Sequence, residues 1–563
     1  MHISSENRFS VPVLTFDTVP TLVNKTGQWR FLTPVRQEKI SPCRAACPLN
    51  IGIPYWVNKL KEEDWEGAWG IMRQYNPFPA VTGHVCYRYC QEECNRGFLD
   101  EEVSVAQLEK ALGAWRHENY KNLMEKENRR PQTDAKVAVV GSGPSGLASA
   151  YYLNALGAQV TVFEKLPEAG GLLTAGIPEY RLPREVLHKE LEILQQEGIV
   201  IKTNIEVGRD ISLEELENDF DAVLLSVGAQ QSKKLDIKGS QLPGVMGALD
   251  FLYEVNLQGN KKVPGSVVVI GGGNTALDAA SLAKFNGAGE VTVLYRRSLK
   301  EMPAHEEEVK TAEDLGVKFL FETKVEEILG QEKAEKVKVL ETCSTEDGES
   351  VEVVPGSAFY LECDLLIAAT GEESSLPGLY PLFSSFLHSN REEHEGNHNS
   401  VFLLLEEVLS EKHSFQLAAA GDAVSGPANV ATAILGGKKA AVELSKLLWP
   451  KGRKIEGDLI APSLEEEIKQ DTVSFEELNS SLVEQVGRRE STRKEAERCF
   501  GCGICNKCGV CWAFCPDLAV DGESGEYEIL LDYCKGCGIC VAECPAGALT
   551  MVVSSNGTQN NER

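Results

Sequence analysis

Several common sequence features are missing or scarce in this chain of 563 residues. No uninterrupted apolar run approaches 18 residues, so we expect no membrane-spanning helix. The first residues, MHISSENRFSVPV, lack the basic region and apolar run of a secretory signal. Positive charge is in deficit, with 56 Lys and Arg against 84 Asp and Glu and a formal net charge of −28. This balance disfavours nucleic acid and anionic lipid as partners.

Isolated cysteines are rare, although the chain contains 17 cysteines. Fifteen of them lie in dense groups towards the two ends, and only Cys343 and Cys363 stand alone. Seventeen cysteines would suit a disulfide-rich secreted protein only if the chain were short. The distribution therefore indicates metal ligation in a reducing compartment, and we expect a cytoplasmic protein.

Two cysteine runs near the carboxyl end repeat each other. They read Cys505-x2-Cys508-x2-Cys511-x3-Cys515-Pro516 and Cys534-x2-Cys537-x2-Cys540-x3-Cys544-Pro545. This is the bacterial ferredoxin pattern, in which each of two 4Fe-4S clusters takes three thiolates from one run and the fourth from the other. The predicted ligand sets are therefore Cys505, Cys508, Cys511 and Cys544, and Cys534, Cys537, Cys540 and Cys515. A pair of zinc sites is the alternative, but the x2-x2-x3 spacing with a terminal Cys-Pro is not the usual zinc arrangement.

Residues 136–165 carry a dinucleotide-binding pattern. An apolar strand leads into Gly141-x-Gly143-x-x-Gly146, and a helical stretch and a second strand ending at Glu164 follow. Between a strand and a helix, with an acid about 20 residues on, this spacing is the Rossmann fingerprint. The glycines permit a tight turn, close approach to a pyrophosphate and close helix packing, and Glu164 would accept hydrogen bonds from an adenosine ribose. A glycine-rich turn without a ligand is the alternative.

A second copy of the pattern lies at residues 266–297. Its small residues are Gly271, Gly273 and Ala276. No acid follows its second strand, where Arg296 and Arg297 stand instead. Guanidinium groups at this point suit the 2′-phosphate of NADP, whereas NAD would need the missing acid. The pattern favours NADP(H) over NAD(H), with two arginines that merely solvate a strand end as the alternative.

A redox-active cysteine pair is also missing. Disulfide reductases with two dinucleotide units carry Cys-x4-Cys after the first unit, but residues 170–183, GGLLTAGIPEYRLP, contain no cysteine. Thiol–disulfide exchange is therefore nearly excluded. Two nested units suggest an FAD domain interrupted by an NAD(P) domain. The chain then returns to the FAD domain at a short apolar strand over 417–420 and a helix over about 430–448.

Four motifs occur in the order that a known family has them. They are GGLLTAGIPEYRLP (170–183), VGAQ (227–230), GGGNTALD (271–278) and YRRSLKEMPA (295–304). Over roughly residues 35–450 the chain resembles the small subunit of bacterial glutamate synthase and is similar to the electron-input half of dihydropyrimidine dehydrogenase. The resemblance implies an enzyme that oxidises NAD(P)H at FAD and passes electrons through iron–sulfur clusters to a ferredoxin or a partner iron–sulfur oxidoreductase. No catalytic side chain is expected, because hydride transfer is centred on the flavin.

The resemblance also implies cofactor contacts outside the glycine positions. Those expected for FAD are Pro144, Ser145, Lys165, Gly171, Leu172, Arg181, Gly421, Asp422, Asn429 and Val430, and those for NAD(P) are Asn274 and Thr275. In flavoproteins that this chain resembles, the aspartate at the position of Asp422 binds the ribityl chain of FAD. The next helix directs its positive end at the flavin.

The family has a helical cap with its own clusters before the first dinucleotide unit. One cap cluster would use Cys47, Cys86, Cys90 and Glu109, with Gln107 as a near alternative at the position of a side-chain amide. The other lacks its amino-terminal R-C-x-x-C pair, although Cys43 and Cys94 match its remaining half.

The segment Arg498-Cys499-Phe-Gly-Cys502 resembles that missing pair, relocated about 450 residues downstream. Our hypothesis is that Cys499 and Cys502 complete a cluster with Cys43 and Cys94, in the same or a neighbouring chain. The alternative is one cap cluster drawn from the five local cysteines, with Cys499 and Cys502 free.

The predicted fold is an α/β multidomain protein. Its parts are an amino-terminal extension (1–34), a helical iron–sulfur cap (35–131), an FAD domain (132–235 and 376–450), an NAD(P) domain (236–375), a charged linker (451–498) and an α+β ferredoxin-like domain with two 4Fe-4S clusters (499–555). A homodimer and a heteromeric complex both stay open. An alternative function also stays open. In it the chain is an electron-wiring or bifurcating subunit of a larger redox complex and feeds a glutamate synthase-like, sulfite reductase-like or 2-oxoacid oxidoreductase partner.

Overall fold

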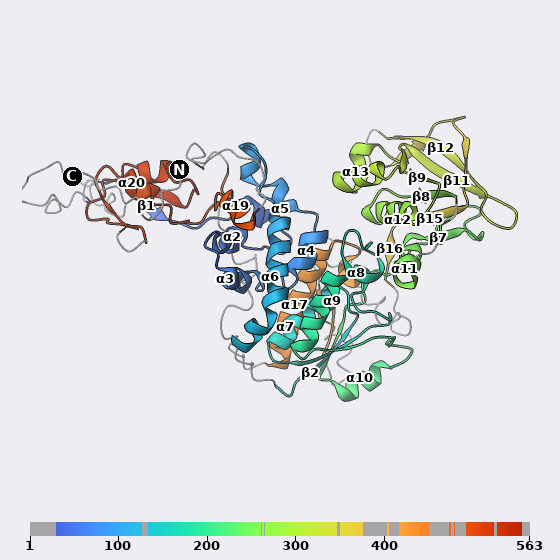
Figure 1. The fold of residues 1–563 in the computed structure, drawn as a ribbon, viewed down its shortest axis with the longest axis horizontal. Coiled ribbons are helices and arrows are strands. Elements are labelled where there is room, and N and C mark those ends of the chain that lie inside the picture. Colours follow the sequence, from blue (N-terminus) through green and yellow to red (C-terminus); the bar gives the residue numbers. More distant parts are fainter. Residues whose placement is uncertain are drawn as a thin grey trace, which may run out of the picture. The chain divides into compact units, whose positions relative to one another are not determined.

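The structure is a computed structural model, and it describes the following residues: 27, 30–126, 133–259, 262–263, 265–345, 350–374, 402–404, 416–449, 472–474, 478, 491–522 and 526–553. The chain forms two compact units. The terminal unit comprises Met1–Gly83, Arg88–Arg116 and Gly457–Arg563, and the central unit comprises His84–Tyr87 and His117–Glu456. In Figure 1 the terminal unit combines blue elements from the amino-terminal part with red elements from the carboxyl-terminal part.

Helices dominate the chain over residues 42–126. They are α1 (Pro42–Ala46), α2 (Ile53–Lys61), α3 (Trp65–Met72), α4 (Pro79–Val85), α5 (Tyr89–Glu92) and α6 (Val105–Lys126), with a 3-10 turn over Asn95–Phe98. In α2 the apolar positions Ile53, Trp56, Val57 and Leu60 recur at helical spacing, and all four are buried. Helix α2 packs against α3.

The carboxyl-terminal part of the terminal unit packs against its amino-terminal part. Its elements are α19 (Thr492–Glu497), α20 (Val510–Ala513), β19 (Val520–Asp521), β20 (Glu528–Ile529), α21 (Ile539–Ala542) and β21 (Leu549–Val553). Helix α19 packs against α2, and β21 pairs antiparallel with β1 (Leu32–Arg36). Two distant parts of the sequence thus share one compact unit.

The central unit contains two parallel sheets. The first has the order β17 (Phe402–Leu404), β18 (Gln416–Ala420), β5 (Ala222–Leu225), β2 (Lys136–Val140), β3 (Gln159–Phe163) and β4 (Val200–Lys202), and only β17 is antiparallel to its neighbour. The second has the order β10 (Lys318–Leu320), β9 (Glu290–Leu294), β8 (Ser266–Ile270), β15 (Leu365–Ala368) and β7 (Val245–Gly247). This doubly wound arrangement places ligands outside the carboxyl ends of the strands.

Helices cover both sheets. Those associated with the first sheet are α7 (Pro144–Ala155), α8 (Leu172–Ala175), α9 (Arg184–Gln196), α10 (Leu213–Asp219), α16 (Asp422–Ser425) and α17 (Val430–Leu448), and those of the second are α11 (Ala248–Gln258), α12 (Asn274–Phe285) and α13 (Glu306–Asp314). An antiparallel group follows the second sheet: β11 (Thr323–Leu329), β12 (Lys336–Ser344), β13 (Val351–Val353) and β14 (Phe359–Glu362). The pair β6 (Gln231–Ser232) and β16 (Glu372–Glu373) marks where the chain leaves the first sheet and returns towards it.

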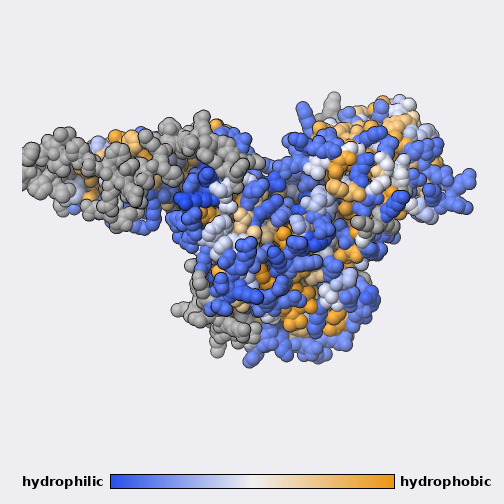
Figure 2. Space-filling view, in the orientation of Figure 1, coloured by the Kyte–Doolittle hydropathy of each residue, from blue (hydrophilic) through white to orange (hydrophobic). Residues whose placement is uncertain are grey.

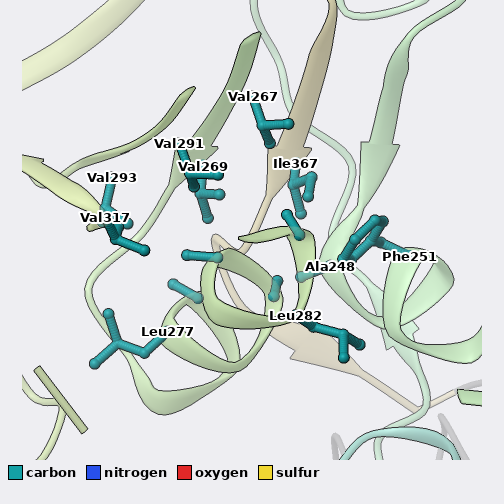
Figure 3. Close-up of a cluster of buried hydrophobic side chains, with 14 of the residues drawn as sticks. Ala248, Phe251, Val267, Val269, Leu277, Leu282, Val291, Val293, Val317 and Ile367 are labelled. Atoms are coloured by element: carbon teal, nitrogen blue, oxygen red, sulfur yellow. The ribbon is translucent and has the colours of Figure 1, made fainter. Parts of the chain in front are cut away.

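The second sheet has a continuous apolar core. Figure 3 shows Val267, Val269, Val291, Val293 and Ile367 of the strands directed at side chains of α11 and α12. All five are buried, as expected for parallel strands covered by helices. In Figure 2, hydrophilic residues cover much of the visible surface of the central unit. None of the helices that the structure describes is long and apolar enough to cross a membrane.

The predicted fold class is confirmed, with two nested Rossmann-type domains and amino- and carboxyl-terminal iron–sulfur regions. The predicted boundaries divide the chain differently from its compact units. The cap and ferredoxin segments share one unit because β1 pairs with β21 and α19 packs on α2, and the boundary between the two units falls within the continuous helix α6, after Arg116. The predicted domain boundaries stay predictions. The predicted boundary at 375/376, most of the linker 451–498 and the tails 1–26 and 554–563 lie outside the described residues.

Candidate functional site

The first glycine motif joins β2 to α7. Gly141 has a φ of +102°, and a Cβ there would overlap the Ser226 carbonyl oxygen. A Cβ on Gly146 would overlap the Gly141 carbonyl oxygen, so Gly146 allows the tight contact between helix and turn. A Cβ on Gly143 would meet nothing within 4 Å. The backbone at Gly143 therefore faces open space, as a pyrophosphate site at a helix amino terminus requires.

The second motif repeats this pattern between β8 and α12. Gly271 has a φ of +140°, and a Cβ there would overlap the Ala369 carbonyl oxygen. Gly273 faces open space, and Ala276 is fully buried. The two motifs thus use their small residues in the same way, although their sequences differ.

A large pocket in the central unit lies beside the first motif. Of the predicted cofactor residues, those lining it are Gly141, Gly143, Pro144, Ser145, Glu164, Lys165, Gly171, Leu172, Arg181, Asn274, Thr275, Asp422, Asn429 and Val430. Gly146, Gly421, Gly271, Gly273, Ala276, Arg296 and Arg297 are not part of its lining. The pocket therefore receives residues of both dinucleotide motifs.

The pocket is also lined by residues that were not predicted, among them Tyr87 and Asp278. Tyr87 lines it and stacks on His305, with ring centroids 4.3 Å apart. Asp278 also lines it. The motif GGGNTALD ends at Asp278 and could have indicated it, whereas no local pattern marks Tyr87.

Glu164 is buried at the end of β3 and holds the first glycine loop. Its Oε2 accepts hydrogen bonds from the Ser142 amide (2.9 Å) and hydroxyl (2.6 Å), and its Oε1 accepts one from the Leu166 amide (2.9 Å). The hydroxyl of Ser142 in turn accepts the Gly170 amide at 2.9 Å. Glu164 therefore shapes the loop, and its predicted contact with a ribose stays a prediction.

Asp422 follows β18 and lines the pocket. Burial, together with the nearby Glu372 carboxylate, raises the pKa of Asp422 to about 6, although an amide hydrogen bond from Ala428 opposes the shift. Its Oδ1 is buried and has no hydrogen-bond partner among the described residues. An unsatisfied buried acceptor is costly. A hydroxyl of a flavin ribityl chain would satisfy this oxygen, so the site fits FAD.

Arg181 contacts two carboxylates of the second dinucleotide domain. Its Nη1 lies 2.8 and 2.6 Å from the Asp278 carboxylate oxygens, and its Nε lies 3.1 Å from Glu308. Burial raises the pKa of Asp278 to about 6, with Arg181 opposing the shift. The guanidinium thus joins the two domains at the pocket wall, and its predicted role in FAD binding stays untested.

The predicted NADP residues follow β9. Arg296 is exposed and Arg297 is half-buried. Arg297 hydrogen-bonds to Tyr295, and a Cβ on Gly272 would overlap the Tyr295 ring. The two arginines therefore stand at the end of β9 next to the second glycine loop, and their contact with a 2′-phosphate stays a prediction.

The two ferredoxin-type sets of cysteines are each brought together. Cys511 interacts electrostatically with Cys505, Cys508 and Cys544, and Cys540 interacts with Cys515, Cys534 and Cys537. All four thiols of the second set line one small cavity, beside Pro34. Amides of Ala519 and Gly536 donate hydrogen bonds to the sulfurs of Cys515 (3.2 Å) and Cys534 (3.4 Å). These donor sets fit 4Fe-4S clusters, whose sulfur ligands commonly accept such bonds.

The cap residues are less completely placed. Cys47 follows α1, Cys90 lies in α5, and these helices pack together. Glu109 is buried and accepts a hydrogen bond from Thr82 (2.8 Å), whereas Gln107 is exposed. Burial raises the pKa of Glu109 to about 7. Cys86 belongs to the central unit, so this ligand set stays a prediction.

The remaining predicted ligands, Cys43, Cys94, Cys499 and Cys502, form a third group within the terminal unit. Across the described residues, no three or more His, Cys, Asp or Glu side chains are arranged around the position of a single metal ion.

Three family models match the chain. Residues 135–388 match pyridine nucleotide-disulphide oxidoreductase, residues 37–121 match dihydropyrimidine dehydrogenase domain II with a 4Fe-4S cluster, and residues 527–550 match a 4Fe-4S binding domain. These matches confirm the predicted cofactors, which are FAD, NADP(H) or NAD(H), and 4Fe-4S clusters.

Curated relatives extend the likeness. The chain is 39% identical to NADPH-Fe(3+) oxidoreductase subunit beta of Geobacter sulfurreducens, over 60% of this chain and 51% of that protein. It is 33% identical to NADP(+)-dependent formate dehydrogenase subunit beta of Moorella thermoacetica, over 72% and 60%. It is 32% identical to the glutamate synthase (NADPH) small chain of Escherichia coli, over 71% and 87%. The chain thus spans only about half of the first relative.

Proposed function

Because this chain belongs to the family of the glutamate synthase (NADPH) small chain, we propose that it is an NADPH:acceptor oxidoreductase. It takes a hydride from NADPH onto FAD and passes the electrons singly through 4Fe-4S clusters to an acceptor protein. The observation that carries this proposal is the composition of the pocket. Gly143 and Asp422 of the first dinucleotide domain and Asn274 and Thr275 of the second line the same space.

The residues of the pocket divide the work of binding. The Gly143 backbone and the amino terminus of α7 would bind a pyrophosphate, and Asp422 would accept a hydrogen bond from a ribityl hydroxyl of the flavin. Helix α17 directs its amino terminus, capped by Asn429 at 2.9 Å from the Thr432 amide, into the pocket wall, where its positive end favours an anionic flavin. Bound FAD supplies the conversion of an electron pair into single electrons. The apolar side chains of Leu172, Leu249 and Leu252 exclude water from the pocket.

The two ferredoxin-type clusters provide the exit for electrons. Cys511 of one set interacts with Cys540 of the other, which supports direct transfer between the two clusters. The acceptor is a ferredoxin or an iron–sulfur subunit of a larger complex. Two relatives that the chain resembles are named as subunits. We place the protein in the cytoplasm, because dense groups of free thiols need a reducing compartment.

Anaerobic rapid mixing of the purified protein with NADPH tests the proposal. The flavin absorbance should bleach first and the broad cluster absorbance second, and NADPH should support reduction of an artificial dye. A protein that binds NADPH but leaves the flavin oxidised, and that a reduced partner can still reduce, would instead be an electron-wiring subunit.

A further inference from the structure

Four cysteines that the ferredoxin pattern does not need lie together in the terminal unit. Cys43 belongs to α1, Cys94 precedes the turn at 95–98, and Cys499 and Cys502 follow α19. The electrostatic interactions join Cys43 with each of the other three, Cys502 with Cys94 and Cys499, and Cys94 with Cys499. All six pairs of these four thiols therefore interact electrostatically, although the sequence separates them by up to 459 positions (502 minus 43).

Backbone contacts fix the segment of Cys502 against the segment of Cys43. The Lys39 amide donates to the Gly503 carbonyl oxygen at 3.0 Å, and the Gly503 amide donates to Ala546 at 2.7 Å. Gly503 has a φ of +78°, and a Cβ there would overlap the Lys39 carbonyl oxygen. Only glycine suits this position, so the sequence permits the close contact between the two segments.

A buried polar network fixes the segment of Cys499 against the segment of Cys94. Arg498 pairs with Glu495 (2.8 Å) and Asp100 (3.1 Å), and Asp100 also pairs with Arg96. The Ser104 amide donates to Glu495 at 2.8 Å. Arg96, Glu495 and Arg498 are each at most 3% exposed. Such a network is costly to bury unless every member is paired, so it specifies one arrangement of these segments.

The sulfur atoms receive several N–H donors. Amides of Val103, Arg96 and Gly97 hydrogen-bond to Cys94, the Gly501 amide donates to Cys499 (3.4 Å), and Asn95 Nδ2 donates to Cys502 (3.6 Å). N–H donors favour an anionic sulfur. Four thiolates at this place need a compensating cation, which bound iron would supply.

We propose that Cys43, Cys94, Cys499 and Cys502 of one chain hold a single 4Fe-4S cluster, which joins the amino- and carboxyl-terminal segments of the terminal unit. The family model that covers residues 37–121 names a 4Fe-4S cluster and includes Cys43 and Cys94, whereas nothing in it supplies Cys499 and Cys502. Cys502 is three residues from Cys505, so their Cα atoms are at most about 11 Å apart. The cluster therefore adjoins the ferredoxin-type set of Cys505 and extends the electron route into the cap.

Iron analysis of full-length variants, reconstituted without oxygen, tests this assignment. Cys499→Ser with Cys502→Ser should lose about four Fe per chain, and Cys43→Ser with Cys94→Ser should lose the same number. The quadruple variant should lose no more than either double variant, because all four residues serve one cluster. Cys343→Ser, at an exposed and isolated cysteine, is the matched control and should retain all iron.

Several outcomes would overturn the proposal. An unchanged iron content in Cys499→Ser/Cys502→Ser would do so. So would zinc bound by these four cysteines in place of iron, or an iron loss in the quadruple variant that equals the sum of the losses in the two double variants. Bound FAD reports folding of the central unit, and a loss of helical circular dichroism in a variant that retains FAD would indicate that the terminal unit has unfolded. As a milder variant, Cys94→Ser should keep the fold and change the low-temperature EPR spectrum of the reduced protein by the signal of one cluster, and an identical spectrum would count against the site. None of these readouts depends on NADPH oxidation, so they separate this site from the proposed activity.

Discussion

At the scale of single residues, Asp422 combines burial with an oxygen that lacks a partner among the described residues. Its pKa is about 6 in the folded chain, against about 3.9 for an ordinary Asp. The native state therefore binds this proton more tightly than the unfolded state. The stability that this provides is complete below the unfolded pKa and is lost as the pH rises through 6. Above that pH the flavin-free protein holds a buried negative charge, which a hydrogen bond from a ribityl hydroxyl of bound FAD would stabilise.

Asp422→Asn should consequently separate stability from cofactor binding. The flavin-free variant should melt roughly 2–4 °C higher than wild type at pH 7.5, with a smaller difference at pH 5. Its affinity for FAD should fall about 5- to 10-fold, because the Asn amide oxygen still accepts the hydrogen bond but without the negative charge that strengthens it. Calorimetry and FAD titration measure both effects, with exposed Asp236→Asn as control. Unchanged affinity for FAD would remove Asp422 from the site.

The arginines at the end of β9 provide a second test at this scale. Arg296→Ala with Arg297→Ala should raise the KM for NADPH about 10- to 150-fold and spare NADH, because only NADPH carries the 2′-phosphate. Steady-state dye reduction with each nucleotide measures the ratio. Lys300→Ala, which removes an exposed positive charge nearby, is the control. Equal effects on both nucleotides would contradict the assignment.

At the scale of elements, the two strand–turn–helix motifs each have small residues at three equivalent positions. A substitution has a different consequence at the middle position than at the first and third. The first and third positions are occupied by small residues because the backbone comes too close to itself, at Gly141 and Gly146 for example. The middle position, Gly143 or Gly273, has an ordinary negative φ and free space around it. A methyl group there meets no protein atom, so its effect falls on the ligand.

Gly143→Ala should therefore leave the melting temperature of the flavin-free protein within about 1 °C of wild type and sharply reduce FAD content. Gly273→Ala should keep FAD and raise the KM for NADPH. In contrast, Gly146→Ala should destabilise the fold by about 1–3 kcal/mol, because the new methyl overlaps the Gly141 carbonyl. Thermal melts together with flavin absorbance distinguish the three variants. A Gly143→Ala protein with full FAD would show that the pyrophosphate lies elsewhere.

At the scale of the whole molecule, the carboxyl-terminal segment is a structural part of the terminal unit. Strand β21 pairs with β1, and α19 packs against α2. Removing this segment takes away cluster ligands and also exposes parts of the core near the amino terminus.

Truncation after residue 490 should accordingly remove about twelve Fe per chain if the shared cluster exists, and about eight if only the two ferredoxin-type clusters are lost. FAD content and NADPH-dependent dye reduction should persist, because the pocket belongs to the central unit. Reduction of a protein acceptor should be abolished. Iron analysis and both assays on the same preparation provide the comparison, and a full rate with a ferredoxin acceptor would place the electron exit elsewhere.

Local spacing was sufficient to predict the nested dinucleotide domains, the roles of Gly141 and Gly146 and the two cysteine runs. The physical reason is that turn geometry, helix packing and cluster ligation each act over a few neighbouring residues. Only the tertiary structure decided that Tyr87 lines the pocket, that Arg181 faces Asp278, and that the segment before Cys43 meets the segment after Cys502. These contacts join residues far apart in the chain, where periodicity carries no information about partners. Strand pairing and side-chain burial in the compact unit select them.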